Sequence, residues 1–575
     1  MKEEVRNALT AVLEDFGMFE EDYVLELERP RDPSHGDLTT NVALTLSKKL
    51  ERKPRELAGE IAAQIDLDRD LVESVEIAGP GFINFRAASG WWVRAITEIL
   101  EGGESFGRSE VGNGERVNLE FVSANPTGPF NIVSARAAAV GSALTRALRW
   151  SGHRAHSEFY CNDAGRQVKL FGASLRARFA EATGRDDVSV PEEGYRGDYV
   201  KDLAAELAAD PSRVPELPEM PAVGRLQGRL PEVKGTPDTW MQLDEEESSA
   251  AFGRYALVRM ITEQRRTCER FGLVYDTWFL ESDLHRNDKL APVLETLRAS
   301  DHVFEREGAV WFRSTDFGDE KDRVLVKADG DATYFLADIA YHASKHDRGA
   351  DRAIDFLGPD HHGHIARMVA ATVALGYEDD WLEPIVLQQV NLIQDGEPLE
   401  MSKRAGRIVT MDALIDEVGA DVAKYFFLAR KNTSHMDFDL DLARAEKREN
   451  PVWYVKYAHA RICSVLRNAE ARSVDAGAVT PAQLKLLTHP LENDLLRLLP
   501  DLPRTVASAA RSREMSRLTS YAYEVASAYH PFQKECRILG DDPDLTLARL
   551  ALCRATRLVL ANALGVLGIH PPEKM

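Results

Sequence analysis

Cysteine is scarce in this sequence, and the cysteines it has stand far apart. Disulfide frameworks and structural zinc sites both need cysteines at close, paired spacing. No CxxC pair occurs among the 575 residues, so we expect buried free thiols and no structural metal site. The five cysteines are Cys161, Cys268, Cys463, Cys536 and Cys553.

Long apolar runs are also missing. No stretch reaches the roughly 18 apolar residues that a membrane-spanning helix needs. The first residues are acidic and place apolar side chains at helical spacing, which predicts an amphipathic helix over residues 2–16 and not a signal peptide. The sequence therefore predicts a cytoplasmic protein without a membrane partner.

An overall excess of positive charge is absent too, since the formal net charge is −22. Such a charge suppresses non-specific binding to phosphates. Its distribution is uneven, because the segment from Arg448 to Met575 has 17 Lys and Arg against 13 Asp and Glu, a net charge of +4. A mildly basic module on an acidic body suits selective binding of one shaped nucleic acid, and a chance distribution of surface charge is the alternative.

The chain is too long for one hydrophobic core, so we expect a multidomain α/β protein. Residues 1–105 have the pattern of an α+β module, with helices near 2–16, 41–50 and 55–65 and strands at 72–77 and 82–85. Glycines at 102–103 and 112–114 mark a flexible junction after it.

A nucleotide-binding α/β domain is expected over residues 106–404. A buried strand at 117–122, a Gly/Pro loop at 125–129 and an alanine-rich helix at 134–151 are typical of its opening unit. The apolar runs 323–327, 353–357 and 385–387 can supply further strands. We expect a Rossmann-like, doubly wound parallel sheet, with an irregular insertion at about 188–247, where proline, glycine and acidic residues gather.

The remainder of the chain favours helices. Residues 405–447 form a connecting segment, and residues 448–575 carry apolar positions three and four apart near 454–466, 484–499, 515–529 and 545–564. This spacing predicts an all-α helical bundle.

The sequence has the blocks EFVSANPTGP at residues 120–129, EFYCNDAG at 158–165 and MSKRAG at 401–406. These blocks resemble signature regions of the arginyl-tRNA synthetases, a family of class I aminoacyl-tRNA synthetases, and MSKRAG resembles the second class signature. Further matching blocks are residues 29–37, 327–342, 358–364 and 457–462. They occur in the family's order along nearly the whole chain.

This resemblance implies an arginine–tRNA ligase. Such an enzyme activates L-arginine with ATP to arginyl-adenylate and transfers the arginine to the 3′-terminal ribose of tRNA(Arg). It also implies Mg²⁺ with ATP as a substrate complex, no tightly bound cofactor, a monomer, and activation that requires the tRNA. The N-terminal module would contact the outer corner of the tRNA, residues 405–447 its stem, and the bundle its anticodon.

Arginine needs carboxylates, because a planar guanidinium donates hydrogen bonds in a fork geometry. Tyr334 and Asp338 are four residues apart on a predicted helix and so share one face. By resemblance, Asp338 pairs with the guanidinium and Tyr334 lines its pocket. We expect Asp338 and Glu120 to bound the acidic crevice that holds the guanidinium. The arginine-binding residues implied by the resemblance are Glu120, Ser123, Asn125, Tyr334, Asp338 and His361.

ATP needs donors and positive charge near its phosphates. A Gly/Pro loop before a helix offers backbone N–H groups and the positive end of the helix dipole. Lys403, on a loop that can close over the triphosphate, matches the lysine that neutralises charge as pyrophosphate departs. The implied ATP-binding residues are Pro126, Thr127, Gly128, Asn131, Ser134, Met401, Ser402 and Lys403, of which Asn131, Ser134 and Lys403 are catalytic.

The chain departs from the family at two places. Glu400 replaces the first lysine of the second signature, and Asn131-Ile132-Val133-Ser134 stands where the family has His-x-Gly-His. Asn131 and Ser134 can donate hydrogen bonds but carry no charge, and losing a preorganised donor costs about 3 kcal/mol of transition-state stabilisation.

Three readings stay open on these departures: an active variant, a catalytically impaired paralogue that only binds RNA or arginine, and a synthetase of another specificity. The pocket residues favour the first, since a chain without catalysis has little reason to keep them. The absence of CxxC spacing argues against the cysteine-specific type.

Aromatic residues among cations in the basic tail can stack on splayed anticodon bases. The resemblance also brings the C-terminal tip towards the RNA. The predicted tRNA-binding residues are Trp453, Tyr457, Arg461 and Met575.

Overall fold

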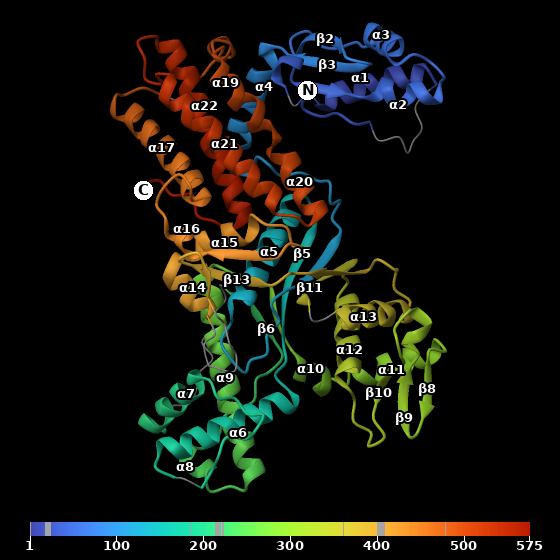
Figure 1. Cartoon of the computed structure of the whole chain (residues 1–575), viewed down its shortest axis with the longest axis vertical. Coiled ribbons are helices and arrows are strands. Elements are labelled where there is room, and N and C mark those ends of the chain that lie inside the picture. Colours follow the sequence, from blue (N-terminus) through green and yellow to red (C-terminus); the bar gives the residue numbers. More distant parts are fainter. Residues whose placement is uncertain are drawn as a thin grey trace.

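The computed structural model is elongated, with the N-terminal module and a helical bundle at one end, a parallel sheet in the middle, and two lobes at the other end (Figure 1). It describes residues 2–17, 25–30, 32–185, 187–212, 220, 223–359, 362–399, 409–475, 477 and 479–575.

The N-terminal module has the predicted α+β composition. Strands β1, β3 and β2 form an antiparallel sheet in that order, and α2 and α3 pack on it. The predicted apolar stripe of α1 is buried at Val5, Leu9, Val12 and Leu13. The elements are α1 (Lys2–Asp15), β1 (Leu38–Thr40), α2 (Val42–Lys49), α3 (Pro54–Gln64), β2 (Val72–Ala78) and β3 (Phe82–Ala87).

The segment after this module is held in place by helix packing. Helix α4 (Ser89–Gly102), which the sequence analysis did not predict, packs against α22 (Pro543–Leu567) of the bundle. Asn562 Nδ2 donates to the carbonyls of Gly103 and Phe106, at 2.9 and 2.8 Å. The glycines at 102–103, expected to mark a flexible junction, are thus tied to the bundle.

The central sheet confirms the doubly wound prediction. Among the described residues it has six strands, all parallel, in the order β12-β11-β4-β5-β7-β6. The chain builds one side of β4 first and then returns to build the other, so the winding reverses between β4 and β11. The strands are β4 (Arg116–Glu120), β5 (Arg154–Cys161), β6 (Arg225–Gln227), β7 (Thr277–Leu280), β11 (Arg352–Leu357) and β12 (Leu382–Val386).

The two faces of the sheet differ in polarity. Phe121 packs against α5 (Ile132–Trp150) so closely that a Cβ on Gly141 would lie 2.2 Å from its ring. Helix α5 also packs against α15 (Ala420–Leu428) and α20 (Leu502–Ser512), which fills this face with apolar side chains. The opposite face carries Glu120 and Glu158, which bond to side chains of α12 (Tyr334–Asp347) and the residue that follows it. One face of the sheet is therefore core, and the other bears the polar groups.

The lobes hold two departures from the predictions. The run at 323–327 was expected to supply a strand like those of the parallel sheet, but β10 belongs to a separate antiparallel sheet with β9 and β8. The stretch predicted irregular, about 188–247, contains helices and an edge strand of the central sheet, because apolar residues of α7 recur at helical spacing and are buried against α6. The elements are α6 (Gly165–Ala182), α7 (Asp198–Ala209), α8 (Pro237–Trp240), α9 (Glu245–Phe271), α10 (Glu281–Arg286), α11 (Leu290–Ala299), β8 (Val303–Arg306), β9 (Ala309–Phe312), β10 (Arg323–Val326) and α13 (His362–Ala374).

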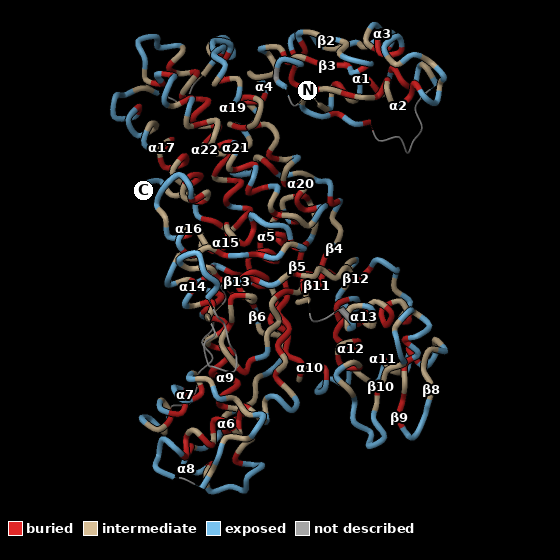
Figure 2. The backbone as a smooth tube through the Cα atoms, in the orientation of Figure 1, coloured by how far each residue is buried: buried red, intermediate tan, exposed pale blue. Residues whose placement is uncertain are grey.

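The C-terminal part is the predicted helical bundle, preceded by a small mixed connecting region. Helix α22 is long and apolar enough to cross a membrane by composition alone. It is, however, the buried central helix of the bundle, in contact with α17, α21 and α4 (Figure 2). The elements are β13 (Val390–Gln394), β14 (Glu397–Pro398), α14 (Met411–Val418), α15 (Ala420–Leu428), β15 (Met436–Asp439), α16 (Leu440–Arg444), α17 (Pro451–Ala471), α18 (Pro481–Leu484), α19 (Pro490–Leu498), α20 (Leu502–Ser512) and α21 (Ser516–Glu535). All five cysteines are free and buried, as predicted.

Candidate active site and RNA-binding surface

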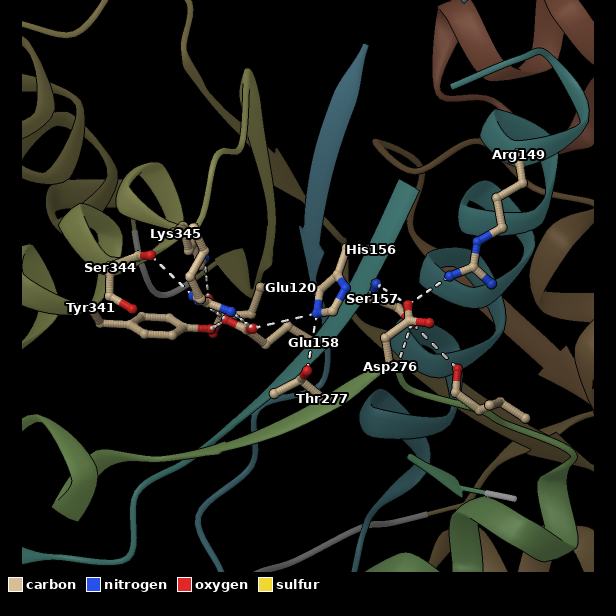
Figure 3. Close-up of polar contacts among 12 residues, drawn as sticks. Glu120, Arg149, His156, Ser157, Glu158, Asp276, Thr277, Tyr341, Ser344 and Lys345 are labelled. Atoms are coloured by element: carbon tan, nitrogen blue, oxygen red, sulfur yellow. Dashed lines mark hydrogen bonds and ion pairs between the residues drawn. The ribbon is translucent and has the colours of Figure 1, made fainter. Parts of the chain in front are cut away.

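Two acidic residues meet where the winding of the sheet reverses. Glu120 is the last residue of β4, and Asp355 of β11 lies beside it in register. The crevice outside the carboxyl ends of the strands at such a reversal is where doubly wound sheets bind ligands. Lys345 of α12 joins the two carboxylates, since its Nζ donates to Glu120 Oε2 at 2.6 Å (Figure 3) and to Asp355 Oδ1 at 2.8 Å.

His342 connects this pair to the next residue of the crevice. Its Nε2 lies 2.6 Å from Asp355 Oδ2, and its Nδ1 lies 2.7 Å from the backbone carbonyl oxygen of Asp338. Burial alone would raise the pKa of Asp355, but Lys345 and His342 hold it well below its usual value. Both partners of the imidazole are thus acceptors, and the ring makes both bonds at once only when it carries two protons.

Asp338 is the carboxyl group that the sequence analysis expected to hold the guanidinium. Its side chain is 30% exposed, and its Oδ2 lies 3.4 Å from His364 Nε2. Burial raises its pKa to about 7, with a further contribution from Glu281 and Glu120 and an opposing one from His342. A cation bound beside Asp338 would favour its ionised form.

Glu281 is a second acidic residue of this crevice, and the sequence analysis missed it. It is the first residue of α10, directly after β7, and its side chain is only 5% exposed. Tyr160 donates its hydroxyl hydrogen to Glu281 Oε2 at 2.9 Å, while burial raises the pKa of Glu281. Within the described residues, neither Asp338 nor Glu281 pairs with a lysine or arginine. A carboxylate directly after a buried strand was the signal that could have revealed Glu281.

A second buried ion pair supports the floor of the crevice. Glu158 of β5 has no exposed side-chain surface and accepts hydrogen bonds from Tyr341 at 2.8 Å (Figure 3) and from Arg348 Nη2 at 2.9 Å. Burial would raise the pKa of Glu158, but Arg348 lowers it below its usual value. The ring of Tyr341 packs on that of Tyr160, with centroids 4.3 Å apart, so this pair also supports the tyrosine that bonds Glu281.

The first signature begins with a strained turn. The sequence pattern predicts a strand up to residue 122, but β4 ends at Glu120. The backbone turns there, because Val122 and Ser123 have φ values of 71° and 40°. A branched residue at positive φ is unfavourable, and such strain gathers at functional sites. Ser123 Oγ accepts from the backbone N–H of Tyr160 at 3.1 Å, which ties the turn to β5.

The rest of the signature loop is held through its carbonyls. Gln264 Nε2 of α9 donates to the carbonyls of Asn125 and Gly128, at 3.2 and 3.0 Å. Tyr199 of α7 donates to the carbonyl of Thr127 at 2.7 Å. These bonds leave the N–H groups of the loop available. Pro126 lies between these anchored residues. Gln264 and Tyr199 are supporting residues that no sequence motif indicated.

Asn131 and Ser134 lie together at the first turn of α5. Asn131 is its N-cap, since its Oδ1 accepts from the backbone N–H of Ser134 at 3.0 Å and from its hydroxyl at 3.3 Å. The positive end of the α5 dipole therefore lies directly beside the loop. Val133, which replaces the family glycine, packs against the apolar core.

Tyr334 begins α12, at the open side of the crevice, and is 55% exposed. Its hydroxyl lies over Gly165, where a Cβ would come within 2.9 Å of it. The backbone of Gly165 has a φ of 80°, a conformation that glycine adopts more readily than other residues. The last residue of the second matching block thus lies against the first residue of α12.

Four of the predicted site residues fall outside the described residues: His361, Met401, Ser402 and Lys403. Their flanks are described. The backbone N–H of Met411 donates to the carbonyl of Phe130 at 2.8 Å, and Thr410 forms an isolated β-bridge with Asn131. The chain that follows the second signature thus returns to the first turn of α5.

The predicted RNA contacts lie on one face of α17. The rings of Trp453 and Tyr457 stack with centroids 4.6 Å apart and an angle of 15°, and the Arg461 guanidinium lies 5.4 Å from the Tyr457 centroid. Met575 is 56% exposed, and the segment before it is tied to the same helix through His459, whose Nδ1 lies 2.8 Å from the carbonyl oxygen of Pro572. This arrangement is a stacking surface with a cation at one end.

Glu120, His342 and Asp355 have ligand atoms within 4.8 Å of one another, the spacing of a metal site. The ammonium of Lys345 is bonded to two of these residues. The described residues therefore fit a buried lysine at this position better than a resident metal ion.

Comparison with known proteins covers the whole chain. Residues 1–87 match the arginyl tRNA synthetase N terminal domain, residues 95–444 the class I (R) tRNA synthetase catalytic domain, and residues 455–575 the DALR anticodon binding domain. The arginine–tRNA ligase of Bacillus subtilis is 42% identical over 578 residues, covering 100% of this chain and 99% of that protein. The ligase of Moorella thermoacetica is 42% identical over 549 residues, covering 96% and 93%. The structure of Thermus thermophilus arginyl-tRNA synthetase superposes with a TM-score of 0.73 at 21% identity and covers 99% of each chain. The chain belongs to the arginyl-tRNA synthetase family.

Proposed function

We propose that the chain activates L-arginine with ATP and esterifies it to tRNA(Arg), and that the guanidinium binds between Asp338 and Glu281. The observation that carries this proposal is that these two carboxyl groups lie near each other, with no lysine or arginine partner in the described chain. A guanidinium bound by two carboxylates uses its fork of donors fully.

The remaining predicted residues surround the other end of the amino acid. Lys345 occupies only Oε2 of Glu120, so Oε1 is suited to the α-ammonium of arginine. Ser123 and Asn125 follow in the signature turn, Tyr334 covers the open side of the crevice, and His361 completes the proposed site.

The signature loop and the first turn of α5 would hold ATP. Pro126, Thr127 and Gly128 present backbone to the nucleotide, and the α5 dipole with Asn131 and Ser134 faces its phosphates. Arginine carboxylate attacks the α-phosphate and pyrophosphate leaves; the terminal ribose hydroxyl of the tRNA then attacks the acyl carbonyl of arginyl-adenylate, and AMP leaves. Lys403 would neutralise the departing pyrophosphate, and Met401 and Ser402 would bind ATP beside it. Mg²⁺ would arrive with ATP, held by the phosphates.

The replacement of His-x-Gly-His does not favour an inactive paralogue. Asn131 caps α5 and so stabilises the first turn of this helix, whose positive end lies beside the loop. Ser134 places a hydroxyl on the same turn. The carboxylates, the loop anchors and the full-length match to arginine–tRNA ligases all favour an active enzyme.

The tRNA would bind along the long axis of the molecule. The Trp453–Tyr457–Arg461 surface suits stacking of anticodon bases, with Met575 beside it. The N-terminal module would reach the outer corner of the tRNA and residues 405–447 its stem. We place the enzyme in the cytoplasm as a monomer.

Arginine-dependent ATP–pyrophosphate exchange, measured with and without tRNA(Arg), tests the proposal. We expect exchange with arginine only when tRNA(Arg) is present. No exchange with any amino acid would support the impaired paralogue, and exchange with another amino acid would support a different specificity. Exchange without tRNA would contradict the expected tRNA requirement alone.

A further inference from the structure

Lys345 is a charged side chain with no exposed surface. An unpaired ammonium in such a place is strongly unfavourable. Here Glu120 and Asp355 accept from it, and the Tyr341 ring centroid lies 4.5 Å from its Nζ. Burial alone would lower the pKa of Lys345, but the two carboxylates raise it. The ammonium is therefore a permanent charge of the crevice.

The permanent cations divide the carboxylates of the crevice into two classes. Arg348 neutralises Glu158, while Lys345 neutralises Glu120 and Asp355. Asp338 and Glu281 have only histidine and tyrosine partners among the described residues. The carboxyl groups that can still pair with a guanidinium are thus those of Asp338 and Glu281.

Without the ammonium, a second acceptor site for a guanidinium would exist. Glu120 and Asp355 are neighbours in register, and without the ammonium the described residues would leave Glu120 without a cation partner and Asp355 with His342 alone. Arginine drawn to them would place its α-carboxylate differently, and a misplacement of about 1 Å can lower a rate a hundredfold.

We propose that Lys345 is a positioning residue for arginine: its buried ammonium holds the carboxylates of Glu120 and Asp355 and so leaves Asp338 and Glu281 to receive the guanidinium. This inference rests on the proposed binding of the guanidinium by Asp338 and Glu281. Lys345 acts through the carboxylates it holds and does not itself touch the substrate.

The structure supplies a route for a chemical test. Lys345 also lines a cleft of about 320 Å³, shared with Asn118, His156, Thr277 and Arg348. Shortening the side chain to alanine would open the space of the missing atoms to this cleft. Those atoms are three carbons and a nitrogen, which n-propylammonium supplies.

The experiment measures aminoacylation by Lys345→Ala with arginine and ATP varied separately. We expect kcat/KM for arginine to fall between about tenfold and a hundredfold, while KM for ATP stays within about twofold. Added n-propylammonium should restore most of the loss, and n-propanol should not. Lys424→Ala is the matched control, since Lys424 is a buried lysine far along the chain that bonds the carbonyl of Gly568, and its activity should not respond to the amine.

Two results would overturn the proposal: an unchanged kcat/KM for arginine, or a loss shared equally with ATP and unresponsive to n-propylammonium. If Lys345→Ala does not fold, Lys345→Met, which keeps the volume, is compared with the parent by the same split between arginine and ATP. Asp338→Asn is assayed in parallel. If that variant keeps the parent kcat/KM for arginine, the proposed guanidinium site fails whatever the Lys345 variants do.

Discussion

Arg146 donates from its Nε to the backbone carbonyl of Val566 at 2.9 Å. This bond joins α5, which begins beside the signature loop, to α22, the central helix of the bundle. Burial lowers the pKa of Arg146 to about 10. No carboxylate of the described chain pairs with Arg146; the Val566 carbonyl and the Ser142 hydroxyl accept its hydrogen bonds instead, and such bonds offset the cost of taking a charged group out of water. The catalytic sheet and the RNA-binding bundle are thus joined through α5.

Replacing Arg146 tests this joint. Arg146→Met removes the donor and leaves the carbonyl of Val566 buried without it. The free energy of unfolding should fall by about 1–3 kcal/mol, measured by urea denaturation. Arg94→Ala is the control, because its pair with Glu98 is half exposed and should contribute about 0.5 kcal/mol or less. Equal effects of the two substitutions would contradict the account.

Arginine binding should depend on pH through Asp338. Its pKa of about 7 in the empty site means that the carboxyl group is partly protonated at neutral pH. The groups around it are His342, His364, Glu281, Glu120, Asp355 and Tyr160. Because a guanidinium binds the ionised form, KM for arginine should fall about tenfold per pH unit up to about pH 7 and then level off. Calorimetry in buffers of different ionisation enthalpy should show proton release on binding at pH 7, and binding without proton release would argue against this assignment.

The same group should make the empty enzyme less stable. Its folded pKa lies above the unfolded value of 3.8, so the penalty is absent below pH 3.8, grows between pH 3.8 and 7, and is complete above pH 7. Asp338→Asn should therefore gain stability over the parent as pH rises, by up to about 4 kcal/mol at pH 8, while arginine-dependent exchange is lost. Thermal denaturation at pH 4.5 and pH 8 checks this, and a variant that is less stable than the parent at pH 8 would refute the account.

Asn131 has two expected effects that can be separated. Asn131→Ala removes the N-cap and should lower the free energy of unfolding by about 1 kcal/mol, and it should also raise KM for ATP. Asn131→Asp keeps the cap but places negative charge near the phosphates, so stability should be kept while KM for ATP rises further. Steady-state kinetics with denaturation curves distinguish these. An unchanged KM for ATP in both variants would show that Asn131 has a structural role only.

The stacking surface on α17 should matter for the RNA and not for arginine. Tyr457→Ala removes the ring between Trp453 and Arg461. KM for tRNA(Arg) should rise between about fivefold and a hundredfold, because base–aromatic stacking contributes about 1–3 kcal/mol per base. KM for arginine should not change. Trp311→Ala, in the antiparallel sheet of the lobe, is the control, and an equal effect from it would show that Tyr457 makes no specific contact.

The sequence allowed prediction of the parts that carry periodic or motif signals. Helical spacing located α1 and the bundle, and the strand-loop-helix pattern located β4 and α5. It did not reveal β5, because the first five residues of this strand have only Ala155 as an apolar residue, and Glu158 on one face bonds Tyr341 of α12. The family blocks indicated Asp338, but Glu281 and Lys345 needed the fold. Glu281 lies in a segment without a matching block, and Lys345 lies on α12 three residues beyond the block at 327–342. The two glycines at 102–103 suggested a flexible junction. The bond from Asn562 to Gly103 could not be foreseen, because Asn562 lies far away in sequence.

A structure of the enzyme with arginine and a non-hydrolysable ATP analogue would locate the guanidinium. We expect it within about 3 Å of the carboxylates of both Asp338 and Glu281, with Lys345 still bonded to Glu120 and Asp355. A guanidinium paired with Glu120 or Asp355, or an arginine bound elsewhere, would contradict this expectation.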